Sequence, residues 1–201
     1  MCRCGGYIGR RHDQIRDFTA DLLREVASND STEPHLQPLS GEILGTGANT
    51  EDSARLDIKA SDFWSDSKDA FFDVRVVHPF ASSYRGQRIA SIYRQHELKK
   101  RAEYGRRVRE VEQGTFTPLV FTTIGGMAGE ATVFYKRLAS LLAERRDERY
   151  SVVMGWLRCS LSFLLLPEAI TCVRGAKRRL VKDIHTDSTS EVVAASHLTL
   201  E

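Results

Sequence analysis

Residues 70–77 read Ala-Phe-Phe-Asp-Val-Arg-Val-Val, and this stretch is the clearest strand signal in the sequence. Its aromatic and β-branched side chains favour a strand, and so continuous an apolar run is typical of a strand that other elements cover. A second strand is predicted over residues 54–60, which alternate around Leu56 and Ile58. Each of these strands carries an acid, Asp57 and Asp73, that local propensity disfavours.

The sequence on either side alternates helical and extended patterns. Apolar residues recur at helical spacing over residues 12–26, and the polar run at 28–31 is expected to end that helix. Residues 33–44, with two Pro and one Gly, predict a short edge strand. The later expected elements are a helix at 89–112 capped by Gly114, a strand at 116–123 closed by Gly125-Gly126, and helices at 128–146 and 150–173. This order predicts an α/β fold with C-terminal helices.

Length and composition bound the class of protein. The chain has 201 residues, 41% of them hydrophobic and 28% charged, which fits one globular domain with a tail. Lys and Arg total 29 against 27 Asp and Glu, and the formal net charge of +2 excludes a histone-like polycation while allowing a local basic patch. Residues 176–201 contain a basic cluster followed by many Ser and Thr residues, and we expect this tail to be disordered.

The sequence shows no targeting or membrane segment. Residues 1–11 lack the apolar core of a secretory signal, and the longest apolar run, residues 161–166, is far shorter than the roughly 20 residues of a spanning helix. An intracellular, reducing compartment is therefore expected, in which the four cysteines are thiols or metal ligands. Cys159 and Cys172 lie in apolar context and are expected in the core.

The two strand acids suggest a functional site. Side chains two apart on a strand share a face, so Lys59 is expected beside Asp57 and Arg75 beside Asp73. Carboxylates that hold Mg²⁺, next to a cation that steadies a phosphoryl group, suit phosphate chemistry. The alternative is that both Asp residues face solvent on the outer side of half-exposed strands.

Several phrases of the sequence together resemble a known family. Asp57, followed by Asp73-Val74-Arg75, resembles the pattern of PD-(D/E)XK nucleases. The wider text resembles the restriction-like endonuclease domain that follows the reverse transcriptase in non-LTR retrotransposon proteins. The phrases are Arg-His-Asp-Gln-Ile-Arg-Asp at 11–17, Phe-Phe-Asp-Val-Arg-Val at 71–76, Lys-Lys-Arg-Ala-Glu-Tyr at 99–104 and Phe-Thr-Pro-Leu-Val-Phe at 116–121. The resemblance covers residues 1 to about 180 and implies a mixed sheet flanked by helices.

The resemblance also implies roles for individual residues. Asp57 and Asp73 would bind Mg²⁺ or Mn²⁺. Arg75 stands where the family pattern has Lys, and it cannot act as a base because its guanidinium stays protonated. Either Asp13 or Glu33 would supply a further acid.

A catalytic Lys could instead come from the helix after the second strand, as in some members of the wider superfamily. Lys99 and Lys100 are both available there. Lys100 shares a helical face with Tyr104, so both side chains would point at the catalytic site. The same helix carries the basic residues expected to line a DNA backbone: Lys99, Lys100, Arg101, Arg106 and Arg107. The alternative is an ordinary solvated helix face.

The N-terminus carries part of a metal-binding pattern. Cys2, Cys4 and His12 provide three ligands, whereas a structural zinc site needs four. Related mobile-element proteins have a Cys/His zinc knuckle just upstream of this domain. The resemblance therefore implies that residues 1–11 are a remnant of a knuckle and residues 12–175 the endonuclease domain, within a fragment whose reverse transcriptase is missing.

These expectations converge on a metal-dependent DNA endonuclease that nicks target DNA by phosphodiester hydrolysis, located in the nucleus. One alternative is a catalytically inactive DNA-binding module derived from such an enzyme. Another is a scaffold domain whose Asp residues are merely solvated, and this alternative predicts neither metal affinity nor salt-dependent DNA binding.

Overall fold

Strand β3 (Asp69–Val77) is the longest of four strands in the part of the chain that the structure describes. This computed structural model describes residues 5–37 and 54–166. β3 pairs antiparallel with β2 (Ile58–Ser61) and parallel with β4 (Thr115–Thr122). β1 (Ser28–Thr32) lies at the edge, antiparallel to β2, so the strand order is β1-β2-β3-β4. The predicted α/β class is confirmed, with a mixed sheet.

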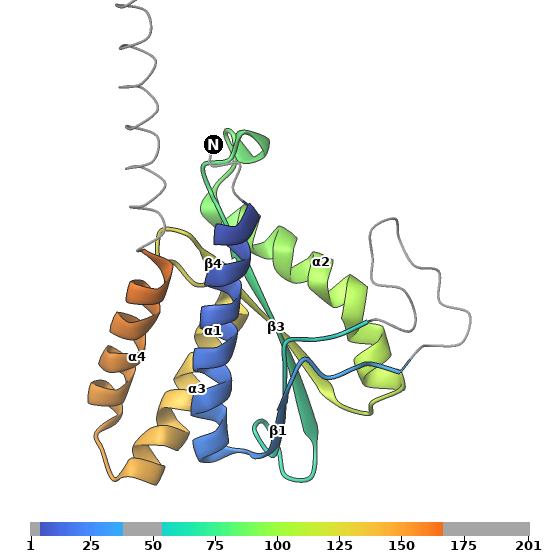
Figure 1. Cartoon of the computed structure of the whole chain (residues 1–201), viewed down its shortest axis with the longest axis vertical. Helices are drawn as coiled ribbons and strands as arrows, with labels where there is room; N and C mark the ends of the chain where they lie inside the picture. Colours follow the sequence, from blue (N-terminus) through green and yellow to red (C-terminus); the bar gives the residue numbers. More distant parts are fainter. Residues whose placement is uncertain (1–4, 38–53, 167–201) are drawn as a thin grey trace, which may run out of the picture.

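Helices cover both faces of the sheet (Figure 1). Helix α1 (Gly5–Val26), helix α3 (Gly129–Arg146) and helix α4 (Tyr150–Leu165) lie on one side. Helix α2 (Ile89–Glu110) lies on the other and connects β3 to its parallel neighbour β4. Parallel strands need such a crossover because a tight turn cannot join them.

The alternating side chains of β3 divide the interior into two clusters. Phe72 and Val74 belong to the larger cluster, with buried residues of α1, α3 and α4. Phe71 belongs to a smaller cluster with Tyr104 and Val108 of α2. Because side chains two apart on a strand share a face, Asp73 lies on the α2 side of the sheet, two residues after Phe71.

The first strand is not where the sequence predicts it. The polar run at 28–31, expected only to end a helix, forms most of β1, and of the strand expected at 33–44 the structure describes a single bridge between His35 and Arg55. β1 is mostly exposed and its register shifts between Ser28 and Ser31. An edge strand needs backbone pairing on one side only, so it can form without apolar side chains. Residues 38–53 lie outside the described residues.

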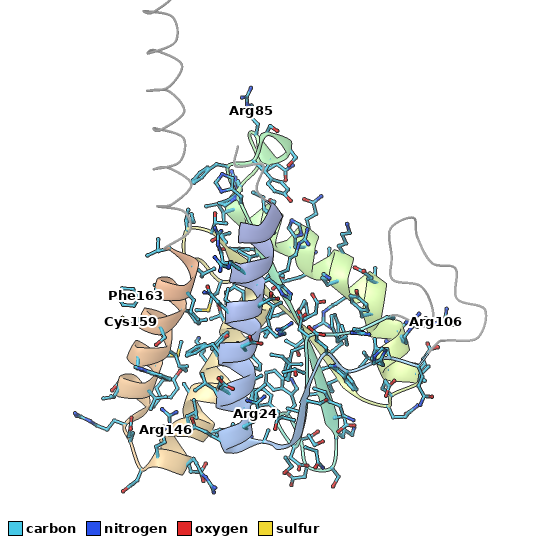
Figure 2. The ribbon with its side chains drawn as sticks, in the orientation of Figure 1. Arg24, Arg85, Arg106, Arg146, Cys159 and Phe163 are labelled. Carbon is cyan, nitrogen blue, oxygen red and sulfur yellow. The ribbon has the colours of Figure 1, made fainter. Side chains whose placement is uncertain are left out.

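The predicted position of Cys159 in the core is wrong. The buried positions of α4 include Val153, Leu157, Leu161 and Leu165, which recur every four residues, and Cys159 lies off this face and is exposed (Figure 2). The helix predicted to reach residue 173 is described only to Leu165. Cys172 and the expected disordered tail at 176–201 lie outside the described residues.

The N-terminal helix starts earlier than predicted. α1 begins at Gly5, so described residues of the expected zinc-knuckle remnant continue the helix that the sequence predicts from residue 12. Cys2 and Cys4 lie outside the described residues. Within residues 5–37 and 54–166, no helix combines the length and apolarity needed to cross a membrane.

Gly114, predicted as a helix cap, is required by a close approach. Its amide donates to Val108 O of the last turn of α2 at 3.1 Å. A Cβ here would lie 2.7 Å from Asp69 O and 2.9 Å from Cε2 of Phe71. Only Gly fits where the α2–β4 connection crosses the beginning of β3.

Candidate active site

The site lies where β2 and β3 part. Asp57 directly precedes β2, and its amide donates to Phe72 O at 3.1 Å. Two residues further along β3, the Val74 amide donates to the side-chain Oδ2 of Asp57 at 2.5 Å. The carboxylate of Asp57 thus accepts the hydrogen bond that a backbone carbonyl would accept if the regular pairing of β2 with β3 continued. The regular pairing of β2 with β3 ends at Ile58 and Phe72, and we call the place beyond it, which contains Asp57 and Asp73, the fork.

Asp73 occupies this fork from β3, and Lys100 reaches it from α2. The Asp73 residue is 5% exposed, and Lys100 Nζ lies 3.1 Å from each of its carboxylate oxygens. Only the contact with Oδ1 has hydrogen-bond geometry. Asp73 Oδ2 is therefore buried without a hydrogen-bond partner among the described residues, which is uncommon for a buried polar atom.

The environment of Asp73 opposes its ionisation. Burial is the main cause that raises the pKa of its carboxyl to about 6. The charge of Lys100 acts in the opposite direction, and the nearby charge of Asp57 raises the pKa further. Two carboxyl groups that share a partly dry site repel each other, and a bound cation relieves this repulsion.

His12 of α1 completes the site from the other side of the sheet. Its Nε2 lies 3.0 Å from Asp57 Oδ2, and its Nδ1 lies 3.2 Å from Asp13 Oδ1. The hydrogen bond to Asp57 is the main cause that raises the pKa of His12 to about 9, against the effect of burial. At neutral pH His12 is therefore an imidazolium that donates to Asp57, and the fork holds two carboxylates and two cations.

Sequence reasoning considered His12 only as a zinc ligand and missed this role. A signal was present, because His12 precedes the buried residues Ile15, Thr19 and Leu22 at helical spacing. It therefore lies on the face of α1 that packs toward the sheet. A titratable residue at the end of such a face is a candidate for a site at the sheet's edge.

Tyr104 forms the floor beneath Lys100. The Lys100 Nζ lies 5.0 Å from the centroid of the Tyr104 ring, as their spacing of four residues on one helix favours. Tyr104 is 6% exposed, and burial raises the pKa of its hydroxyl well above the ordinary value. It holds Lys100 in place and keeps its own proton.

Of the two strand cations, Lys59 differs from the expectation. Lys59 does not join Asp57: its Nζ lies 2.7 Å from Oδ2 of Asp69 at the start of β3. Arg75 is exposed at the mouth of the site. Burial, then the charges of Arg75, Lys99 and Lys100, lower the pKa of the neighbouring His96, so these three cations gather around it.

The two candidate further acids lie in different places. Asp13 is linked to the fork through His12, although its own side chain is 53% exposed. Glu33 pairs with Arg16 at 2.5 Å and with Arg55 at 3.7 Å, and its amide donates to Asp57 O at 2.9 Å. Within residues 5–37 and 54–166 there is no group of three or more His, Cys, Asp or Glu side chains arranged to hold a metal.

The basic residues of α2 separate into distinct environments. Lys100 is in the fork, Arg101 pairs with Glu130, and Arg106 pairs with Glu110 at the far end of the helix (Figure 2). Arg107 is 2% exposed, so the expectation that it contacts DNA is wrong in this structure. Of the five expected DNA-binding residues, only Lys99 is exposed without an ion pair to another described residue.

Comparisons with known proteins leave the family open. No protein-family model matches the chain, and none of the curated proteins matches it.

Proposed function

We propose that this chain is a metal-dependent DNA endonuclease domain of the PD-(D/E)XK type. The observation that carries the proposal is the convergence of Asp57, Asp73 and Lys100 at one fork of the sheet from three separate elements. A buried carboxylate beside a second carboxylate and a Lys is costly for stability alone, and such strained groups gather at functional sites.

The buried carboxylate of Asp73 supports binding of a divalent cation in the fork. Asp73 Oδ2 is buried without a hydrogen-bond partner among the described residues, and carboxylate oxygens are common ligands of hard cations such as Mg²⁺. Asp57 and Asp73 would hold Mg²⁺ or Mn²⁺, with water and a substrate phosphate completing the ligands, since Mg²⁺ sites often use only one or two carboxylates. The ion would supply a Lewis acid for a phosphoryl oxygen.

The chain's own groups supply the remaining functions. Contacts with Asp73 and the Tyr104 ring hold Lys100 Nζ in place. The positive charge of Lys100 would stabilise the negative charge that develops on the phosphate during attack by water. His12 orients Asp57 by donating to its Oδ2. Arg75 keeps its proton and would contact a neighbouring DNA phosphate from the mouth of the site.

A second candidate is a catalytically inactive DNA-binding module. The observation that favours it is the balance of charge in the fork, where Lys100 and His12 already neutralise two carboxylates. A divalent cation would have to compete with both. Either activity would suit one domain of a longer nuclear mobile-element protein that also contains a reverse transcriptase, and this context is part of the proposal.

Nicking of supercoiled plasmid in Mg²⁺ or Mn²⁺ tests the proposal. Asp73→Asn should reduce the rate about 100-fold or more, because the variant loses a ligand charge and the partner of Lys100. The matched control is Asp69→Asn, four residues earlier on β3 and also paired with a Lys, which should nick at the parental rate. Equal rates for parent and Asp73→Asn would overturn the proposal. No nicking by a folded parent that still binds DNA would favour the inactive module.

A further inference from the structure

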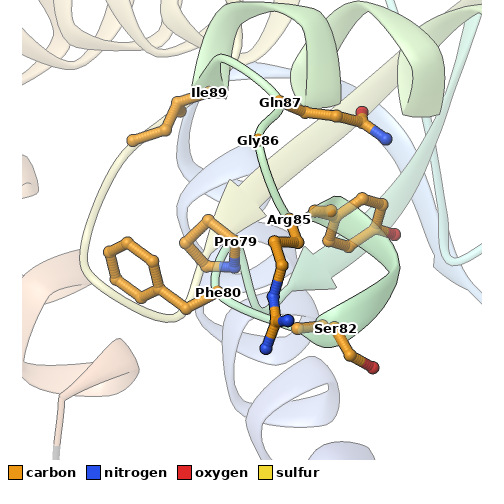
Figure 3. A pocket seen from close by; sticks show the side chains of 9 residues that line it. Pro79, Phe80, Ser82, Arg85, Gly86, Gln87 and Ile89 are labelled. Carbon is orange, nitrogen blue, oxygen red and sulfur yellow. The ribbon is translucent and has the colours of Figure 1, made fainter.

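The loop between β3 and α2 forms a hollow beyond the site. Residues 78–88 make this loop, which contains the short helix η2 (Ser82–Tyr84). The hollow has a volume of about 470 Å³ and is lined by Pro79, Phe80, Arg85 and Ile89, among others (Figure 3). This volume is in the range of small-ligand pockets, although the hollow is open to solvent.

Hydrogen bonds fix the shape of this loop. The Tyr84 hydroxyl lies 2.7 Å from Nε2 of His96, which is itself buried in α2. Within the loop, the Ala81 amide donates to His78 O and the Tyr84 amide donates to Ala81 O. His78 is tied in turn to Thr123 at 2.9 Å. The loop is therefore a preformed surface, so it would lose little entropy on binding.

The loop presents a bare aromatic ring. Phe80 is 70% exposed and Ile89 is 39% exposed, so one wall of the hollow is apolar and open. The imidazole of His78 meets the Phe80 ring edge-on, with 6.0 Å between centroids, and leaves the rest of the ring uncovered. An exposed Phe on a fixed loop offers the face of its ring for stacking.

The same segment is positively charged. Between Asp73 and Glu97 the sequence has no acidic residue and four Arg residues. Of these, Arg85 and Arg88, the residue before α2, are exposed and form no ion pair with any described residue. Arg85 lies at the tip of the loop (Figure 2). Cations beside an open aromatic ring are the combination that binds a nucleotide, with the ring on the base and the cations on phosphates.

We propose that this loop captures an unstacked DNA base near the cleavage site. Phe80 stacks on the base, Ile89 closes the hollow, and Arg85 and Arg88 contact the flanking phosphates. The inference rests on the proposed function and specifies its substrate: DNA with an unpaired or readily unstacked base. Phe80 is seven residues after Asp73, and at about 3.3 Å per strand residue their Cα atoms lie at most about 23 Å apart, the length of about seven base pairs.

Equilibrium binding of the full chain to DNA in EDTA tests this inference without any cleavage. The probes are two duplexes of the same sequence, one fully paired and one with a single unpaired 2-aminopurine. Phe80→Ala should weaken binding of the unpaired probe about five- to 150-fold, because a stacked base contributes about 1–3 kcal/mol to binding. The same variant should abolish the quenching of the aminopurine. Phe80→Trp should retain both signals.

The matched control is Phe163→Ala. Phe163 is 68% exposed on the outer side of α4, which lies on the opposite side of the sheet from α2 (Figure 2). Its removal should change neither the binding of the unpaired probe nor the quenching. Arg85→Gln should weaken binding to both probes equally and reduce the dependence on salt, as expected of a phosphate contact. Phe80→Ala binding that matches the parent, or an equal loss in Phe163→Ala, would overturn the inference.

The two proposals fail separately. Base capture by a parent that never nicks plasmid would leave this inference standing and remove the endonuclease. Nicking that requires Asp73, in a parent whose binding of the unpaired probe ignores Phe80, would do the reverse.

Discussion

Strand β3 carries two Asp residues, each paired with a Lys, and they behave in opposite ways. Lys59 lies 2.7 Å from Asp69 and 5.5 Å from the centroid of the Phe71 ring. Lys100 lies 3.1 Å from Asp73 and 5.0 Å from the centroid of the Tyr104 ring. The two pairs are close copies in chemistry. Burial tends to raise the pKa of Asp69, but its hydrogen bonds with Lys59 and Ser61 prevail and lower it, whereas burial raises that of Asp73.

Solvent and a second acid explain the difference. The side chains of Asp69 and Lys59 are 32% and 30% exposed, so water already solvates both charges and the pair is a surface contact. The Asp73 side chain is 8% exposed and faces Asp57, so its charge is expensive and a single Lys does not compensate for it. The comparison shows that a carboxylate–lysine pair marks a functional site only where desolvation and a like charge oppose it.

The largest expected difference between the pairs is in DNA cleavage. Lys100→Met should lower the rate of plasmid nicking about 100-fold, because the variant loses the cation placed to stabilise developing charge. Lys59→Met should stay within about twofold of the parent, because Lys59 does not reach the fork. Thermal melting of both variants is the control for folding. Similar losses in two folded variants would remove the distinction between the pairs.

The pairs should also differ in how pH affects stability. The pKa of Asp73 in the folded state, about 6, exceeds the value of about 3.9 in an unfolded chain. Its protonated form favours folding, so this contribution is complete below about pH 4 and is lost as the pH rises through about 6. The pKa of Asp69 is lowered, so its stabilisation is present above about pH 4 and is lost in acid.

Urea unfolding between pH 4.5 and 7.5 measures this difference. Relative to the parent, Asp73→Asn should gain free energy of unfolding as the pH rises through this range. Asp69→Asn should keep a constant difference from the parent above about pH 5. Parallel profiles for the two variants would show that burial does not separate the two carboxyl groups.

The charge of His12 also distinguishes Asp73 from Asp69. His12 lowers the pKa of Asp73 through its charge, and no such effect of His12 acts on Asp69. His12→Gln should therefore raise the pKa of Asp73 further and leave that of Asp69 unchanged. Carboxyl ¹³C shifts followed through a pH titration report both groups in one sample. An unchanged Asp73 titration would place the His12 charge outside the fork.

The central elements of the fold were predictable because their signals are long and local. Residues 70–77 and 116–121 are strands because their apolar, β-branched composition leaves no alternative, and α2 follows from more than 20 residues without Pro. β1 escaped prediction because the backbone of β2 specifies it, and its own polar side chains do not. Pairing with a neighbour that is distant in sequence leaves no local trace.

The site was predicted in part for the same reason. Asp73 contradicts strand propensity and is therefore visible in sequence. Asp57 drew attention for the same reason, but the strand predicted over residues 54–60 begins only at Ile58, so Asp57 directly precedes it. The choice between Lys99 and Lys100 was open, although Lys100 lies midway between His96 and Tyr104 on the buried face of α2 and Lys99 does not. The pairing of Lys59 with Asp69 could not be predicted from the sequence, because it depends on the hairpin register, which the β2–β3 turn sets.

The smallest expected difference concerns salt. A double-mutant cycle of Lys59→Met and Asp69→Asn should give a coupling energy of at most about 1 kcal/mol in low salt and almost none in 1 M NaCl, because mobile ions screen exposed charges. The corresponding cycle for Lys100→Met and Asp73→Asn should give the same coupling energy at both salt concentrations, because salt ions cannot come close enough to a buried pair to screen it. The readout is the free energy of unfolding in urea at both salt concentrations. If salt removed the second coupling as well, ions would have access to the fork, and the desolvation that distinguishes Asp73 from Asp69 would be absent in solution.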